Sequence, residues 1–132
     1  MSRILLADGP VQVWAIDSVV LAEAGDAGQI IVCGSHGGLH GHRPETALGV
    51  EARAAIFNDA GIGKDAAGVS RLPVLAARGI AGATVAAASA RIGSARSTYE
   101  DCILSAVNGP AARLGAAPGM RAAAFVRLAT AA

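Results

Sequence analysis

The chain has 132 residues, of which 53% are hydrophobic and 16% charged, and its formal net charge is +1. This length predicts one domain over residues 1–132, and the balanced charge, with no basic run, argues against nucleic-acid or anionic-membrane partners. No uncharged apolar stretch reaches the about 18 residues that a membrane span needs. The apolar run near the N-terminus is too short for a secretory signal, so we expect a cytoplasmic protein.

Short apolar runs predict the strands of the fold. They lie over residues 3–7, 29–33, 53–57 and 82–87, and each of the last three enters a loop of small or polar residues. Residues 19–24 fit a short helix capped by Asp17 or Ser18, although the β-branched pair Val19 and Val20 leaves a strand open.

Apolar residues at helical spacing predict three longer helices. The first covers residues 65–78, with an interruption at Pro73. The second begins at Thr98, and the third covers residues 120–130. In the second helix the residues expected to share one face are Ile103, Leu104, Val107 and Ala111.

Strands that alternate with helices are typical of βα units. The sequence therefore predicts an α/β fold, a small three-layer sandwich with a mostly parallel sheet of about four strands and helices on both faces. We interpret the two cysteines, Cys33 and Cys102, as buried, reduced thiols because they have no CxxC spacing. Alanine-rich helix faces suit contacts between subunits, so we also expect a homo-oligomer.

Three loops after predicted strands are the candidate functional segments. They cover residues 34–38, 58–65 and 89–93. In an open parallel sheet the ligand crevice lies beyond the carboxyl ends of the strands, so these loops are expected to meet there.

The first loop places Ser35 and His36 between glycines. Flexible backbone at Gly37 and Gly38 lets amide groups approach a ligand closely, which makes both glycines candidate substrate-binding residues. Ser35 and His36 form a candidate catalytic pair, but neighbouring residues of extended backbone point in different directions. His36 alone as a general acid or electrophile is the better hypothesis. The alternative is an ordinary glycine turn.

Residues 31–37, Ile-Val-Cys-Gly-Ser-His-Gly, resemble the strand and glycine turn of universal stress proteins, a family of α/β nucleotide binders. In that family the turn comes late in the chain and is followed at fixed spacing by glycine with serine or threonine. Here the turn comes early and the spacing reaches Ala47. The resemblance therefore carries no ATP site to this chain, and no family is assigned from it.

All three histidines, His36, His40 and His42, lie within seven residues, with Glu45 just beyond. Imidazole is a good ligand for zinc and other transition metals. The spacing matches no established metal motif, so the prediction is no metal site, with His40 and His42 solvated in a loop.

The second loop resembles part of a phosphate loop, because Gly-Ile-Gly-Lys follows a strand and precedes a helix. The complete motif needs glycine where Asn58 stands and serine or threonine where Asp65 stands, so nucleotide hydrolysis is not predicted. A site for a carboxylate or a single phosphate remains. Its alternative is a solvated Lys64 beside a helix cap at Asp65. The candidate residues are Asn58, Gly61, Gly63 and Lys64 for substrate binding and Asp59 for proton transfer.

The third loop offers Ser89 and Arg91 as substrate-binding residues, since an arginine can hold a carboxylate with two hydrogen bonds. The alternative for Arg91 is a salt bridge to Glu100 or Asp101.

Together these loops predict a small enzyme, a lyase, isomerase or hydrolase, that acts on a small anionic, carboxylate-containing substrate. Lys64 and Arg91 would hold the anion, and His36 or Asp59 would transfer protons. No cofactor is identified. The alternatives are a non-catalytic module that binds a phosphate or nucleotide, and a structural or regulatory subunit of a larger complex.

Overall fold

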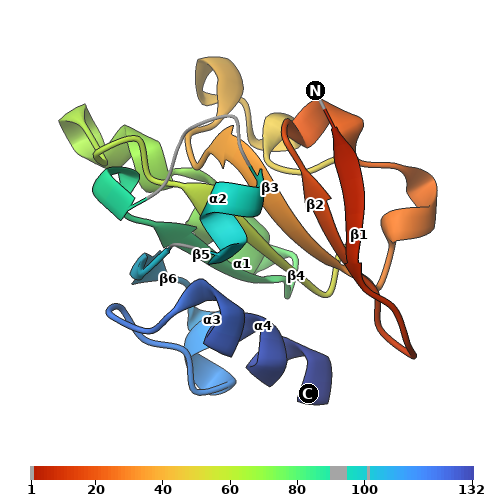
Figure 1. The fold of residues 1–132 in the computed structure, drawn as a ribbon. Helices are drawn as coiled ribbons and strands as arrows, with labels where there is room; N and C mark the ends of the chain where they lie inside the picture. Colours follow the sequence, from red (N-terminus) through yellow and green to blue (C-terminus); the bar gives the residue numbers. More distant parts are fainter. Residues whose placement is uncertain (1, 90–94, 101) are drawn as a thin grey trace.

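The computed structural model describes residues 2–89, 95–100 and 102–132 of the chain (Figure 1). Within these residues the strands are β1 (Arg3–Ala7), β2 (Val13–Ile16), β3 (Ile30–His36), β4 (Ala54–Asn58), β5 (Ala81–Val85) and β6 (Leu104–Val107). The α-helices are α1 (Arg71–Ala77), α2 (Ala95–Glu100), α3 (Gly109–Arg113) and α4 (Ala122–Ala131). Short 3-10 helices are η1 (Val19–Leu21), η2 (Ala24–Asp26), η3 (His40–His42), η4 (Pro44–Thr46), η5 (Lys64–Val69) and η6 (Ala87–Ser89).

The strands form one six-stranded mixed sheet in the order β1-β2-β3-β4-β5-β6. β2, β3, β4 and β5 are parallel, whereas β1 and β6 pair antiparallel at the two edges. The expected sandwich with a mostly parallel sheet of about four strands and helices on both faces is therefore wrong. In the described residues α2 and α4 pack on one face, and α1 with single-turn 3-10 segments covers the other.

Two strands account for much of this error. β2 has only four residues and was not predicted, yet it lies between β1 and β3 and hydrogen-bonds to both. The helix predicted from Thr98 onward ends at Glu100 in α2, and the chain then forms β6. Ladder bonds to β5 satisfy the backbone of β6, so tertiary pairing overrides the helical spacing of Leu104 and Val107.

The helix predicted over residues 65–78 is also divided. Residues 64–69 form the 3-10 segment η5, and α1 begins only at Arg71. Pro73 is the third residue of α1, where a backbone N–H has no intrahelical acceptor and proline is tolerated.

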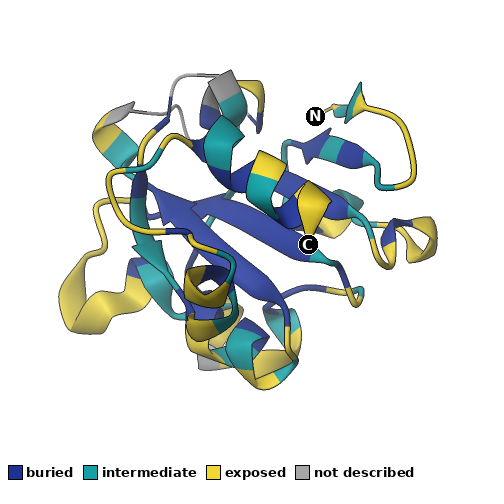
Figure 2. Ribbon diagram, turned by 90° about the horizontal axis from the view of Figure 1, so that it is seen from below, coloured by how far each residue is buried: buried dark blue, intermediate teal, exposed yellow. Residues whose placement is uncertain are grey.

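Side-chain alternation along the central strands produces two cores, one on each face of the sheet. Ile30, Val32 and Ile56 face α4, while Ile31 and Phe57 face the side of α1. Figure 2 shows the buried residues as a continuous band along these strands. No helix in the described part of the chain is long and apolar enough to span a bilayer.

Cys33 and Cys102 are both buried and form no disulfide, which agrees with their interpretation as buried, reduced residues. Burial raises the pKa of the Cys33 thiol, so it stays protonated at neutral pH.

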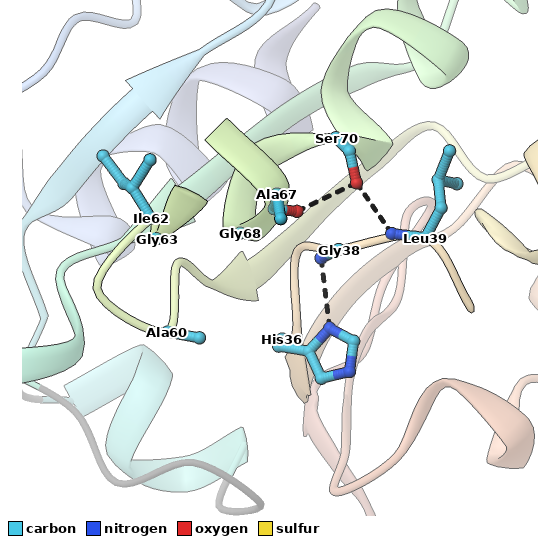
Figure 3. Close-up of a pocket in the computed structure, with 9 residues that line it drawn as sticks. All are labelled: His36, Gly38, Leu39, Ala60, Ile62, Gly63, Ala67, Gly68 and Ser70. Atoms are coloured by element: carbon cyan, nitrogen blue, oxygen red, sulfur yellow. Dashed lines mark hydrogen bonds between the residues drawn. The ribbon is translucent and has the colours of Figure 1, made fainter. Parts of the chain in front are cut away.

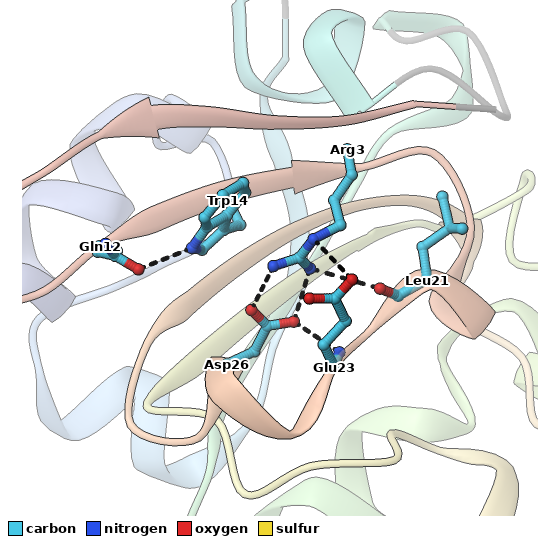
Figure 4. A network of polar contacts seen from close by, with 6 residues as sticks. All are labelled: Arg3, Gln12, Trp14, Leu21, Glu23 and Asp26. Atoms are coloured by element: carbon cyan, nitrogen blue, oxygen red, sulfur yellow. Dashed lines mark hydrogen bonds and ion pairs between the residues drawn. The ribbon is translucent and has the colours of Figure 1, made fainter.

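A buried ion pair anchors β1 to the segment after β2 (Figure 4). The Arg3 guanidinium donates two hydrogen bonds to the Asp26 carboxylate, at 2.7 and 2.8 Å, and lies 4.2 Å from the centre of the Trp14 ring. Asp26 is 1% exposed and also accepts the Glu23 N–H at 2.8 Å. Burial opposes ionisation of Asp26, but the hydrogen bonds from Arg3 and the Glu23 amide lower its pKa below the usual value.

We expect Asp26→Asn to lower the free energy of unfolding by about 3 kcal/mol at neutral pH, because it removes the buried carboxylate that accepts two hydrogen bonds from Arg3 and leaves only the exposed Glu23 carboxylate near the guanidinium. In the wild type, the stabilisation by the Arg3–Asp26 ion pair should be present above pH ~4 and lost as the pH falls through the lowered pKa of Asp26. Urea titrations between pH 3 and pH 7 measure both effects. Glu45→Gln, at the exposed Arg43–Glu45 pair, is the control and should leave stability unchanged; equal effects of the two substitutions would contradict the assignment.

Candidate functional site

The carboxyl ends of β2, β3, β4 and β5 lie at one edge of the sheet, because these strands are parallel neighbours. The three loops singled out in the sequence therefore begin next to one another, after His36, Asn58 and Val85. His36 and Asn58 are Cα partners in the ladder between β3 and β4.

A cleft of about 300 Å³ opens at this edge, between the turn after β3 and the segment after β4 (Figure 3). Backbone and apolar side chains make most of its wall. Ser70 Oγ donates to the Ala67 carbonyl oxygen at 2.9 Å and accepts the Leu39 N–H at 2.8 Å, so this hydroxyl is already engaged. The lining residues are His36, Gly38, Leu39, Ala60, Ile62, Gly63, Ala67, Gly68 and Ser70.

Glycines let the two walls of the cleft pack backbone against backbone. A Cβ added to Gly37 would lie 2.3 Å from the Gly68 carbonyl oxygen, and one added to Gly38 would lie 2.8 Å from the Ala67 oxygen. A Cβ on Gly68 would lie 1.8 Å from the Asp59 carbonyl oxygen. No side chain fits at these three positions.

The amides of Gly37 and Gly38, predicted to bind substrate, already have partners within the protein. The Gly37 N–H donates to the Asn58 carbonyl oxygen at 2.6 Å, and the Gly38 N–H donates to His36 Nδ1 at 3.1 Å. The structure thus gives these glycines a packing role.

His36 presents an unused proton donor at the cleft. Its Nδ1 accepts the Gly38 N–H, so a neutral ring must carry its proton on Nε2. In the described part of the chain no acceptor lies within hydrogen-bond distance of Nε2. The side chain is half-buried and contributes to the cleft wall (Figure 3).

A buried arginine, Arg71, joins the segments on either side of His36. Its side chain is 0% exposed and makes no ion pair with a carboxylate of the described residues. The guanidinium donates to the carbonyl oxygens of His36 at 3.1 Å, Ala47 at 2.6 Å and Thr46, and lies 5.2 Å from the Phe57 ring centre. Burial lowers the pKa of Arg71, but a guanidinium remains protonated in proteins.

Three effects lower the pKa of His36. Burial of the ring is the largest, followed by the positive charge of Arg71 and by the electrostatic effect of His40. The His36 and His40 rings meet edge to face with centres 5.6 Å apart, and His40 Nε2 lies 3.4 Å from Arg71 Nη2. His36 is therefore a neutral imidazole at neutral pH.

The other two predicted catalytic residues have structural hydrogen bonds. Ser35 Oγ accepts the Val19 N–H at 2.9 Å and makes no bond to His36, so the predicted serine–histidine pair does not form. Asp59 is 3% exposed, and its Oδ1 accepts the Gly61 N–H at 2.7 Å and the Ala87 N–H at 3.0 Å. Its Oδ2 has no hydrogen bond to a described residue.

The loop after β4 is not a regular phosphate-binding turn. Lys64 is exposed and does not line the cleft, and neither does Gly61, whereas Gly63 does. η5 is a 3-10 segment interrupted by left-handed backbone, so no regular helix N-terminus faces an anion. Among the described residues, those with positive φ other than glycine are Ala60, Ile62, Asp65 and Ala66. All four lie in the segment after β4, and Ala60 and Ile62 line the cleft.

The third predicted loop lies largely outside the described residues. Arg91 falls in residues 90–94, and the side chain of Ser89 is not described either, so their predicted roles stay predictions. Among the described residues, no group of three His, Cys, Asp or Glu side chains is arranged to hold a metal ion.

Arg71 was missed in the sequence, although a signal was present. It stands four residues before Leu75, so in a helix both lie on the same, buried face. An arginine on an apolar helix face indicates a buried cation, whose N–H groups need hydrogen-bond acceptors within the protein.

Comparison with protein-family models, curated proteins and solved structures finds no match.

We expect Gly68→Ala to lower the free energy of unfolding by about 3 kcal/mol, because its Cβ displaces the Asp59 backbone. Gly49→Ala is the matched control: no atom lies within 4 Å of its added Cβ, and the lower flexibility of the unfolded chain should raise stability slightly. Thermal denaturation of both variants tests this, and an unaffected Gly68→Ala protein would contradict the close packing.

We expect Arg71→Met to raise the pKa of His36 and to lower the unfolding free energy by about 3 kcal/mol, since it removes a cation and leaves buried carbonyl groups unpaired. Histidine titration by NMR and urea denaturation measure the two effects. Arg78→Met is the control, because Arg78 also binds carbonyl oxygens, those of Leu48 and Val50, but away from the cleft. A His36 pKa unchanged by Arg71→Met would contradict the electrostatic role.

Proposed function

We propose that this protein is an enzyme that acts on a small molecule with a carbonyl or carboxylate group, bound in the cleft beside His36. One observation carries the proposal: a neutral imidazole, whose Nε2–H has no acceptor among the described residues, lines a cleft walled mainly by backbone and apolar side chains. Small-molecule sites typically combine apolar walls with a few polar groups that fix orientation.

The role proposed for His36 is that of an electrophile. A neutral imidazole that donates its Nε2–H to a carbonyl oxygen stabilises the negative charge that develops there when an adjacent C–H or C–C bond breaks. The buried charge of Arg71 adds to this effect. This chemistry favours a lyase or an isomerase over a hydrolase, because Ser35 is held by Val19 and is not paired with His36.

Asp59 is the proposed proton acceptor. It precedes Ala60 of the cleft wall, and its Oδ2 has no hydrogen bond to a described residue. Asp59 is buried and does not itself line the cleft. Because Oδ1 is held by two backbone amides, Oδ2 is the oxygen that takes the substrate proton in this proposal. A binding module that leaves its ligand unchanged would use the same cleft, and recovery of intact ligand after incubation distinguishes the two.

We propose further that the protein acts in the cytoplasm, which the absence of a disulfide at its two buried cysteines supports. Self-association through alanine-rich helix faces stays a prediction, which light scattering of the purified chain would test.

Thermal-shift measurements with pyruvate, acetate and phosphate test the binding proposal. A probe present at about one hundred times its Kd should add about 2.7 kcal/mol to the stability of the folded state. We expect pyruvate to stabilise the protein, and His36→Phe, which keeps a ring but no N–H, to abolish the effect. Lys64→Ala is the control and should retain it, since Lys64 lies outside the cleft lining.

Stabilisation by phosphate alone, lost in Lys64→Ala, would contradict the proposal in favour of an anion site on the loop. So would a pyruvate response that is equal in the wild type and His36→Phe.

A further inference from the structure

Asn58, the last residue of β4, has a buried donor without an acceptor. Its side chain is 0% exposed, and its Oδ1 accepts the Ala60 N–H at 2.8 Å. Its Nδ2 has no hydrogen-bond partner, and no other buried side-chain nitrogen or oxygen of the described residues lacks one. Exchanging the amide oxygen and nitrogen would remove the acceptor for Ala60, so the orientation is fixed by the backbone.

The unpaired donor of Asn58 lies next to His36. The two residues are Cα partners in the parallel ladder, after an irregularity in the register between Val32 and His36. The Gly37 N–H donates to the Asn58 carbonyl oxygen and holds the two strand ends together. Two N–H donors that have no partner among the described residues, His36 Nε2 and Asn58 Nδ2, therefore belong to residues at neighbouring strand ends.

Asn58 is also linked to the wall of the cleft. Ala60, whose N–H binds Asn58 Oδ1, lines the cleft directly. The side-chain amide of Asn58 is thus hydrogen-bonded to a residue of the cleft wall, in a segment where the backbone of Ala60 and Ile62 has positive φ. Buried polar groups in folded proteins are almost always paired, so an unpaired donor here points to a partner that the described residues do not supply.

We propose that Asn58 is a specificity residue whose Nδ2 donates to an oxygen of the bound ligand, beside the oxygen or oxygens bound by His36. This inference rests on the proposed function and narrows it. Both groups are donors, so the ligand atoms that they bind are acceptors without protons, as in a carboxylate or a 2-oxo acid. A ligand with a hydroxyl or an ammonium group at this position would leave one donor unpaired.

Titration of the ¹⁵N-labelled full chain with pyruvate tests the inference, because one spectrum reports the His36 ring and the Asn58 side-chain amide separately. We expect both sets of signals to shift with the same Kd. Asn58→Leu has a side chain of similar shape with neither a donor nor a charge, so it should weaken pyruvate binding about tenfold.

Asn108→Leu is the matched control for stability. The side chain of Asn108 donates to the carbonyl oxygens of Leu72 and Ile80 and accepts the N–H groups of Gly82 and Ala111, so this variant loses four hydrogen bonds. Asn58→Leu loses only the bond from the Ala60 N–H, and it should be the more stable of the two variants.

A shift of the His36 signals with an unchanged Asn58 amide would overturn the role of Asn58 and leave the proposed function in place. If neither the His36 signals nor the Asn58 amide signals shift, both the role of Asn58 and the proposed function are overturned. A long-lived internal water, detected by magnetisation transfer to the Asn58 amide and still present at saturating pyruvate, would also overturn it, since the donor would then have its partner without ligand.

Discussion

The buried guanidinium of Arg71 is the interaction on which the cleft depends. It binds the carbonyl oxygens of His36, Thr46 and Ala47, and so connects the end of β3 with the segment that precedes β4. A buried cation without a carboxylate among the described residues costs free energy, which these carbonyl groups and the Phe57 ring offset. After burial of the His36 ring, the same charge is the next largest effect that lowers the pKa of His36, so one side chain serves both the fold and the electrostatics of the site.

Close backbone packing completes the cleft. Gly37, Gly38 and Gly68 bring the turn after β3 and the segment after β4 together without side chains between them. The N–H groups of Gly37 and Gly38 in the turn already have acceptors within the protein. Side-chain donors, and not these amides, are therefore the groups that can bind a ligand in the cleft. The cleft therefore differs from a phosphate loop, in which backbone amides themselves bind the ligand.

The strands β3, β4 and β5 were predictable because they are continuous apolar runs that end in glycine or polar residues. Their parallel order and the position of His36 at their common edge follow from the same pattern. β2 and β6 were not predictable, since four-residue strands are stabilised by their neighbours more than by local preference. The engagement of Ser35 and Asp59 by backbone amides was likewise hidden, because it depends on contacts with Val19 and Ala87.

The central claim is that His36 is a neutral imidazole with its proton on Nε2. Long-range ¹H–¹⁵N correlation spectra of the imidazole at neutral pH test it most directly, because protonated and unprotonated ring nitrogens have separate chemical shifts. The structure predicts an unprotonated Nδ1, the acceptor of the Gly38 N–H, and a protonated Nε2. A proton on Nδ1, or an imidazolium with both nitrogens protonated, would contradict the account.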